Sequence, residues 1–255
     1  MPYRKVQAEK LSSAVVRQIE SLILRGILRP GERLPAEREL AEKMGVSRPS
    51  LRAALSELED SQLLVTRAGS GVYVAEVLGS AFSAPLIRLF ATHDEALFDY
   101  LAFRCDLETL AAERAARLAS QTDLDIIDAI FCKMEKAAET DDQTAEAHLD
   151  AEFHLAIIEA SHNVIMVHMM RSMFEMLRQG VFYNRQVMFD QQTTRTALLD
   201  QHRAINSALQ ARDAQGAKAA VAAHLGFVES AMHDKQRMAR NEATAQLRFS
   251  HEKSR

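Results

Sequence analysis

From about residue 79 onward the sequence follows a helical pattern almost without interruption, and this pattern constrains the fold more than any other feature. Apolar residues recur every three or four positions, and the stretches are separated by polar segments that suit helix ends, such as SQTD, ETDD and SHN. Helices that each carry one apolar face bury it by packing on one another, so the pattern predicts an all-α bundle. The expected helices lie near 79–91, 95–118, 122–139, 143–161, 164–188, 193–211 and 213–236.

The beginning of the chain carries a different pattern. Residues 8–26 form a helical repeat that ends at Gly26, and ERELAEKMGVSRPSLRAALS then predicts two short helices joined by a sharp turn at Gly45. Ala41 is small enough for the second helix to cross close by, and Ser47 is suited to cap its start. The next segment, LLVTRAGSGVYVA, predicts two short strands around a tight turn. This order is typical of a winged helix-turn-helix with a small β-hairpin wing.

The two patterns divide a mostly α chain into parts. We expect a winged helix-turn-helix over 1–76, called the head below, an all-helical domain over 77–238, called the body, and a flexible tail over 239–255. Only nine Gly and five Pro occur in 255 residues, which favours helices.

Composition also bears on the compartment. No run of about 18 apolar residues occurs, so no membrane span is expected, and the first ten residues lack the apolar core of a signal peptide. Cys105 and Cys132 lie inside helical patterns without metal-ligand spacing, and we expect buried free thiols in a reducing cytoplasm.

The start of the second helix of the turn carries two arginines that suit DNA reading. Arg48 and Arg52 are four residues apart at the helix end that enters the major groove, where arginine binds guanine bidentately. Arg38 on the preceding helix is placed to reach a phosphate or a base edge. The hydroxyls of Ser47 and Ser50 can bind phosphate at the positive helix end.

The wing and the charge distribution favour the same function. Gly69 in the wing turn allows the backbone to approach the minor groove, and Arg67 brings positive charge there. Residues 1–75 carry twelve Lys and Arg against nine Asp and Glu, whereas the remainder carries nineteen against twenty-six. A basic head joined to an acidic body is typical of a protein that binds DNA through the head alone. The alternative is a helical hairpin with solvated arginines.

The stretch HLDAEFHLAI places a carboxylate and an imidazole on a partly apolar helix face. Asp150 and His154 are four residues apart and share that face, and His202 and His224 lie beside apolar stripes on two later helices. A bundle can aim all four side chains into one cavity. One carboxylate and three imidazoles suit divalent Zn, Ni, Mn or Fe, with coordination positions left open. From spacing alone, an ordinary core histidine is the commoner interpretation of each.

Together these segments resemble a known family. LRPGERLPAERELAEKMGVSRPSLRAALSELE is similar to the N-terminal winged helix of the GntR family of bacterial regulators, and the helical remainder resembles the ligand domain (FCD domain) of its FadR subfamily. The resemblance covers residues from about 8 to 236. It implies that operator DNA is contacted by Arg38, Arg48, Arg52 and the wing-tip Gly69. Ala68 replaces a wing histidine found in the fatty-acid regulator.

The same resemblance implies a metal site. FadR-type domains carry an Asp-x-x-Phe-His element, matched by Asp150, Phe153 and His154, and single histidines on two later helices, matched by His202 and His224. One divalent ion is therefore expected, with zinc as the first choice. The fatty-acid-binding relatives lack these ligands, so a long acyl chain is not the expected effector.

Two further residues are candidate effector contacts. In the family, an arginine at the position of Arg104 faces the cavity and suits an effector carboxylate. The alternative is a surface ion pair between Arg104 and Glu108. Asn206 lies one turn beyond His202 and is either a second contact or an exposed polar residue.

The sequence therefore predicts a cytoplasmic, homodimeric, DNA-binding regulator that is not an enzyme. Two heads on a two-fold axis read a palindromic operator, and the body binds the effector and supplies the dimer contact. The resemblance to glycolate, L-lactate and pyruvate regulators implies a small 2-hydroxy- or 2-oxo-carboxylate such as glycolate or lactate. A repressor is expected, and activation stays open. The alternatives are regulation by pyruvate, a sugar acid or the metal itself, and more distantly a metal-dependent hydrolase.

Overall fold

The computed structural model describes the chain except for residues 1–9, 77–80, 141, 179–191 and 254–255. The chain separates into two compact units. The first is Met1–Ser83 together with Val167–Glu175, and the second is Ala84–Met166 together with Met176–Arg255. The first contains the winged helix, and the second contains most of the helical body.

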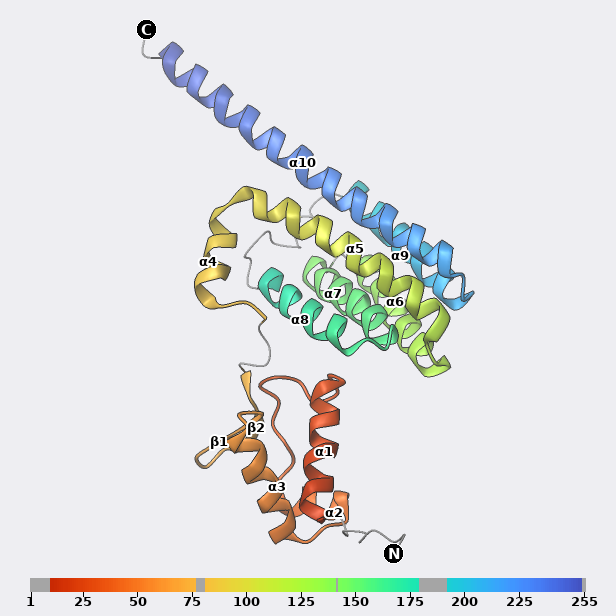
Figure 1. Cartoon of the computed structure of the whole chain (residues 1–255). Coiled ribbons are helices and arrows are strands. Elements are labelled where there is room, and N and C mark those ends of the chain that lie inside the picture. Colours follow the sequence, from red (N-terminus) through yellow and green to blue (C-terminus); the bar gives the residue numbers. More distant parts are fainter. Residues whose placement is uncertain (1–9, 77–80, 141, 179–191, 254–255) are drawn as a thin grey trace, which may run out of the picture. The chain divides into compact units, whose positions relative to one another are not determined.

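The head is a winged helix-turn-helix, as predicted (Figure 1). Strands β1 and β2 pair antiparallel, from Leu64 opposite Val74 to Arg67 opposite Gly71, and form the wing. The elements follow the expected order: α1 (Leu11–Leu24), α2 (Glu37–Met44), α3 (Arg48–Asp60), β1 (Leu64–Arg67) and β2 (Gly71–Val74).

A glycine in the left-handed backbone conformation and a serine that caps the next helix produce the sharp turn between α2 and α3. Gly45 ends α2 with a φ of 64°, a backbone conformation that costs glycine little. Ser47 caps α3 by accepting a hydrogen bond from the backbone N–H of Ser50. Ala41 is buried at the crossing, and the core beneath it is shared by α1, α3 and the wing, through Ile19, Leu51, Leu58, Leu64 and Val74.

The remainder of the described chain is helical, which confirms the fold class. The helices are α4 (Ala84–Thr92), α5 (Asp94–Leu118), α6 (Gln121–Thr140), α7 (Gln143–Ala160), α8 (Val164–Arg178), α9 (Gln192–Gln210) and α10 (Ala214–Lys253). The part of the predicted helix 164–188 beyond residue 178 lies outside the described residues. None of the helices described here is both long and apolar enough to cross a membrane.

Helix α5 is central to the packing of the body, because it contacts α7, α9 and α10 (Figure 1). Helix α6 packs against α7 and α9. One core cluster joins these helices, with fully buried side chains that include Ala112, Ile127, Phe153, Ile205 and Val221. The candidate site histidines and acids described below lie on the inward faces of the same helices. The packing of the core therefore also fixes their positions.

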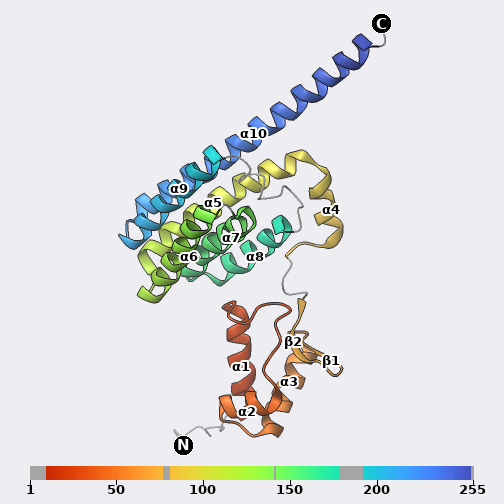
Figure 2. The same cartoon turned by 180° about the vertical axis from the view of Figure 1, so that it is seen from behind.

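Helix α10 is longer than the sequence predicts. We expected the helical pattern to end near residue 236 and to leave a flexible tail over 239–255, but α10 continues to Lys253 and extends beyond the other helices of the body (Figure 2). Every side chain from 237 to 253 is exposed, so no apolar stripe marks this stretch. It contains no Gly or Pro, and pairs such as Gln246 with Glu242 and Arg237 with Asp234 support it locally.

Both cysteines are free thiols, as predicted. Cys105 is half-buried, and burial raises the pKa of its thiol. The expectation that Cys132 is also buried is wrong, because Phe131 and Met134 take the inward positions of α6 and leave Cys132 exposed.

Replacing Gly45 by Ala is expected to destabilise the head by about 1 kcal/mol or more, because alanine rarely adopts a positive φ. No atom lies within 4 Å of an added Cβ, so strain in the backbone is the only expected effect. Gly45→Asn is the control and should lose less, since asparagine tolerates this region better. Hydrogen exchange of the amides of α2 and α3 in the full chain measures the loss. An alanine variant as stable as the parent would contradict the left-handed turn.

Candidate metal centre and nucleic-acid interface

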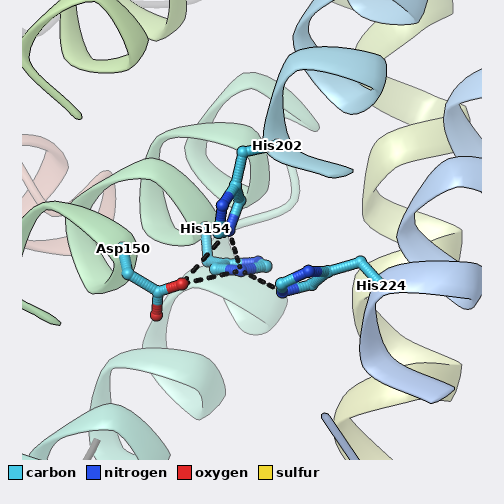
Figure 3. Close-up of side chains that lie close together, drawn as sticks. All are labelled: Asp150, His154, His202 and His224. Carbon is cyan, nitrogen blue, oxygen red and sulfur yellow. Dashed lines mark hydrogen bonds and ion pairs between the residues drawn. The ribbon is translucent and has the colours of Figure 1, made fainter. Parts of the chain in front are cut away.

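Four side chains from three helices converge in the core of the body (Figure 3). Asp150 and His154 are one turn apart on α7, His202 lies on α9 and His224 lies on α10. All four are buried, and one donor atom of each lies within 4.8 Å of the corresponding atom of every other. The four residues that the sequence and the resemblance predicted as ligands are therefore brought together.

The separations within the cluster fit a metal ion. Oδ1 of Asp150 lies 3.1 Å from Nε2 of His202 and 3.8 Å from Nε2 of His154. Nε2 of His154 lies 3.2 Å from that of His224 and 3.4 Å from that of His202. Ligands about 2.1 Å from a shared ion would be about 3.0 to 3.4 Å from their neighbours. Three of these four distances lie in that range, and the 3.8 Å between Asp150 and His154 exceeds it, so the donor atoms are close to the spacing that one ion requires.

The imidazole of His224 is suited to act as a neutral ligand. Burial lowers the pKa of His224 well below its usual value, and positive charge on His202 or His154 would lower it further. Nδ1 of His224 lies 3.0 Å from Oε1 of Gln201, which accepts its proton and leaves Nε2 toward the cluster. Gln201 was not predicted as part of the site, although it directly precedes His202.

Glu108 on α5 performs the same task for His154. Its Oε2 lies 2.5 Å from Nδ1 of His154, so this ring nitrogen faces the carboxylate while Nε2 faces the cluster. Its other oxygen accepts a hydrogen bond of 2.6 Å from Nε of Arg104. Burial raises the pKa of Glu108, but Arg104 and His154 outweigh burial and hold the pKa at about 2. Glu108 is therefore an anion at neutral pH.

Arg104 forms the predicted pair with Glu108, but this pair is not on the surface. The two side chains are only 1% and 2% exposed, and the guanidinium carbon of Arg104 lies 5.9 Å from the ring centre of Tyr100. Arg104 is therefore joined through Glu108 to the candidate ligand His154. The alternative of a solvated surface pair is wrong.

Asn206 is buried on α9, so it is not the exposed polar residue that we considered as its alternative. It donates to Oδ1 of Asp128 at 2.8 Å and accepts from Nε2 of Gln210 at 3.2 Å. Both partners lie outside the four-residue cluster. The bond to Asp128 ties α9 to α6, which is a structural role that the sequence did not predict.

A second buried ion pair lies beside the cluster. Two guanidinium nitrogens of Arg195 on α9 donate hydrogen bonds to Glu146 on α7. Nε donates to Oε2 over 3.1 Å, and Nη2 donates to Oε1. Glu146 precedes Asp150 by one helical turn, and Arg195 precedes His202 by about two. The helical spacing places Glu146 on the same face of α7 as Asp150, and Arg195 on the same face of α9 as His202. The ion pair between Glu146 and Arg195, however, depends on how α7 and α9 pack.

The predicted DNA-reading residues are mostly exposed on the head. Arg38, Arg48, Arg52 and Ser47 are exposed and Ser50 is half-buried, with 2.8 Å between the two serine hydroxyls. Glu37, which was not predicted, accepts a hydrogen bond of 2.8 Å from Nε of Arg52 and lies 3.9 Å from Nη2 of Arg48. It holds the two arginines beside each other at the start of α3.

The wing tip has the features that close approach to DNA requires. Gly69 has a φ of 70°, and no atom lies within 4 Å of a Cβ placed there, so the tip is open. Arg67 lies at the end of β1, bonds to Glu76 at 2.6 Å and stacks over the ring of Tyr73 at 4.6 Å. Its side chain is about half exposed and carries charge at the base of the tip.

Comparison with known proteins identifies both parts. Residues 11–74 match the model described as bacterial regulatory proteins, gntR family, and residues 99–227 match the FCD domain. A protein of Escherichia coli (strain K12) named for regulation of the L-lactate dehydrogenase operon is 36% identical over 231 residues, which are 89% of this chain and 88% of that protein. The Glc operon transcriptional activator of the same strain is 33% identical over 233 residues, covering 90% and 92% of the two chains.

A solved structure shows the same fold. The structure named Streptococcus agalactiae GntR aligns with a TM-score of 0.55 at 24% identity and covers 86% of this chain and 99% of that one. The matching families and these relatives are all transcription regulators, which confirms that the function is not enzymatic. The chain belongs to the GntR family of bacterial regulators, in its FadR subfamily with an FCD domain, and is a DNA-binding transcription regulator.

Proposed function

We propose that this regulator binds a palindromic operator as a homodimer, and that a small 2-hydroxy- or 2-oxo-carboxylate held at a divalent metal ion modulates this binding. Glycolate and lactate are the favoured effectors. The observation that carries the proposal is the buried cluster of one carboxylate and three imidazoles, which is joined to Arg104 through Glu108.

The donor set supports one divalent ion per chain, with zinc first and nickel, manganese or iron as alternatives. Asp150, His154, His202 and His224 would hold it, and Glu108 and Gln201 orient two of the imidazoles. A bound ion would supply positive charge and open coordination positions, which the carboxylate and hydroxyl of a 2-hydroxy acid can chelate in a five-membered ring.

Arg104 would bind the effector carboxylate, because a guanidinium makes strong charge-assisted hydrogen bonds to such groups. Glu108 restrains this guanidinium, so little side-chain entropy remains to be lost on binding. Asn206 would reach an effector only by giving up a bond to Asp128 or Gln210. The relatives named for the L-lactate dehydrogenase and Glc operons are consistent with a small organic acid.

On the head, Arg48 and Arg52 would read base edges in the major groove, with Arg38 beside them. Ser47 and Ser50 would bind phosphate, and the wing would bring Gly69 and Arg67 to the minor groove. One head reads a few base pairs, so two heads related by a two-fold axis are needed for a specific palindromic operator.

Regulation would follow from linkage between the two sites. An effector shifts an equilibrium between dimer shapes only by its differential affinity for them. For a repressor acting on cytoplasmic DNA, the effector therefore favours the shape that fits the operator poorly. The bound acid would thus release the operator.

The first prediction concerns the operator. Arg48→Ala or Arg52→Ala should cost roughly 1 to 3 kcal/mol of binding free energy at one base-pair position in each half-site. Arg237→Ala is the matched control, because Arg237 is an exposed, ion-paired arginine on α10. Titration of the native promoter at two salt concentrations, followed by fluorescence anisotropy, measures the change. A double Arg48→Ala/Arg52→Ala variant that binds as tightly as the parent would show that α3 does not read the groove.

The second prediction concerns the metal. His202→Ala should lose most of the bound ion and lower the melting temperature, because a ligand that binds only the folded state stabilises it. His162→Ala is the control, since His162 is an exposed histidine that bonds to Asp123 outside the cluster. Elemental analysis of protein purified without added metal gives the content of each variant. Equal content in the parent and in His202→Ala would place the metal elsewhere.

The third prediction concerns the effector. Glycolate or lactate at about 100 times its dissociation constant should add roughly 2.7 kcal/mol of stability and should change operator affinity. Removal of the metal should abolish most of this gain. The double variant Arg104→Gln/Glu108→Gln should also lose most of this gain in stability. Both residues are changed together, because Arg104→Gln alone would leave the buried carboxylate of Glu108 without its cation.

A thermal-shift series gives the comparison, with glycolate, both lactates, pyruvate, gluconate and a medium-chain fatty acid. The proposal fails if the fatty acid is the strongest stabiliser, or if the best acid works equally well without metal and in the double variant.

A further inference from the structure

The wing has a third, short member that the sequence did not predict. Residues 31–34, which precede α2, pair antiparallel with the edge of β2 that β1 leaves open. The backbone N–H of Leu34 donates to the carbonyl of Val72 over 2.9 Å, and Arg33 lies directly opposite Tyr73. Strand β2 therefore lies between this segment and β1.

This pairing sorts the side chains of the wing onto two faces, because residues opposite each other in an antiparallel pair share a face and successive residues alternate. The inner face packs into the core of the head through Leu34, Leu64 and Val74. The outer face of the wing consists of Arg33, Val65, Arg67, Gly71 and Tyr73. Two of these five residues carry positive charge and none carries a carboxylate.

Both arginines of the outer face lean across β2. A Cβ added at Gly71 would lie 3.1 Å from Nε and 3.4 Å from Nη2 of Arg33, so the guanidinium of Arg33 lies against the space that this glycine leaves. The guanidinium carbon of Arg67 lies 4.6 Å from the ring centre of Tyr73. The two arginines start on opposite sides of β2, so their guanidinium groups converge over the same strand.

The charge of this outer face is only partly neutralised within the head. Arg67 bonds to Glu76, but the two side chains are 48% and 71% exposed, and an exposed ion pair is weak. Arg33 is exposed, and within the part of the chain that the structure describes its guanidinium has no hydrogen bond or ion pair. Two converging guanidinium groups with one exposed carboxylate beside them favour an anion as their occupant.

The position of the outer face selects the anion. Residues 68–70 form the wing tip and connect β1 directly to β2, so the outer face is continuous with the tip. The proposed function brings this tip to the minor groove of DNA, and phosphates line both edges of that groove. Ser70 adds a hydroxyl, which lies 2.5 Å from that of Tyr73. Guanidinium and hydroxyl groups are among the side-chain groups that bind DNA phosphates.

We propose that the outer face of the wing is a phosphate-binding surface, on which Arg33 and Arg67 hold the DNA backbone at the edge of the minor groove beside each operator half-site. The inference rests on the proposed function of the head and adds a surface and a residue, Arg33, to its DNA contacts. Arg33 supplies affinity that does not depend on base sequence, whereas Arg48 and Arg52 supply the sequence preference.

Salt dependence measures a phosphate contact directly. The logarithm of the binding constant falls with the logarithm of the salt concentration, with a slope of about −0.9 for each phosphate neutralised. Arg33→Gln removes two such contacts from a dimer, so its slope should be less steep by about 1.8. Between about 50 and 200 mM salt, the variant should therefore lose roughly tenfold less affinity than the parent.

A comparison of two DNAs separates phosphate binding from base reading. Fluorescence anisotropy with the native promoter and with an unrelated duplex of the same length gives the slope and the affinity for each. The slope should change on both DNAs. The ratio of the two affinities should stay within about fivefold of that of the parent, because a phosphate contact carries no sequence information.

Three further variants control for charge and folding. Arg25→Gln removes the same charge from an exposed position that follows α1 and lies outside the outer face, so it should keep the slope of the parent. Arg33→Lys keeps the charge and should keep most of the slope. Thermal melting checks the fold of each variant. Arg67→Gln should also make the slope less steep, and it decides the result if Arg33→Gln does not fold.

The outcomes separate this inference from the proposed function. A slope for Arg33→Gln equal to that of the parent overturns the phosphate surface and leaves groove reading by Arg48 and Arg52 intact. An equal change of slope in Arg25→Gln also overturns it, because the net charge of the head would then explain the effect. A change of more than about fivefold in the affinity ratio would make Arg33 a base contact instead. A parent that binds the native promoter no more tightly than the unrelated duplex contradicts the proposed function and this inference with it.

Discussion

Burial of carboxylates, arginines and imidazoles in a helical core is the constraint on which the rest of the body depends. A charged group away from water costs several kcal/mol unless a partner offsets it, so each such group dictates what lies next to it. Glu108 has Arg104 on one side and His154 on the other, and Glu146 holds Arg195 with both oxygens. These contacts link α5 to α7 and α7 to α9, so the polar centre also fixes how the helices pack.

The same arrangement would allow a small ligand at the proposed metal site to have a large structural effect. The four candidate ligands come from α7, α9 and α10, and α5 contacts all three of these helices. An ion and a chelating acid would tie the three helices at one point, and packed cores respond by moving between discrete arrangements rather than by bending smoothly. The head is built by different means, since local signals at Gly45 and Ser47 place α3 against α2, and no charged side chain is buried in the part of the head that the structure describes.

Most of the fold could be predicted from the sequence because its signals are local. Gly45, Ser47 and the two short strands around a tight turn in LLVTRAGSGVYVA predict the head, and apolar periodicity predicts the helices of the body. The four candidate ligands lie on predicted apolar faces, but it was the resemblance that favoured a shared site over separate core histidines. The bond between Arg195 and Glu146 spans 49 residues and depends on helix packing, so no local pattern shows it. The last turns of α10 were missed because an exposed helix needs no apolar stripe.

X-ray absorption at the metal edge of protein purified without added metal tests the central claim most directly, with spectra taken before and after addition of L-lactate. The account predicts a first shell of imidazole nitrogen and carboxylate oxygen at about 2.0 to 2.2 Å, without sulfur at about 2.3 Å. It also predicts that lactate changes the oxygen part of this shell in the parent. A shell that contains sulfur, a shell without imidazole, or a spectrum that a saturating and stabilising effector leaves unchanged would contradict the account.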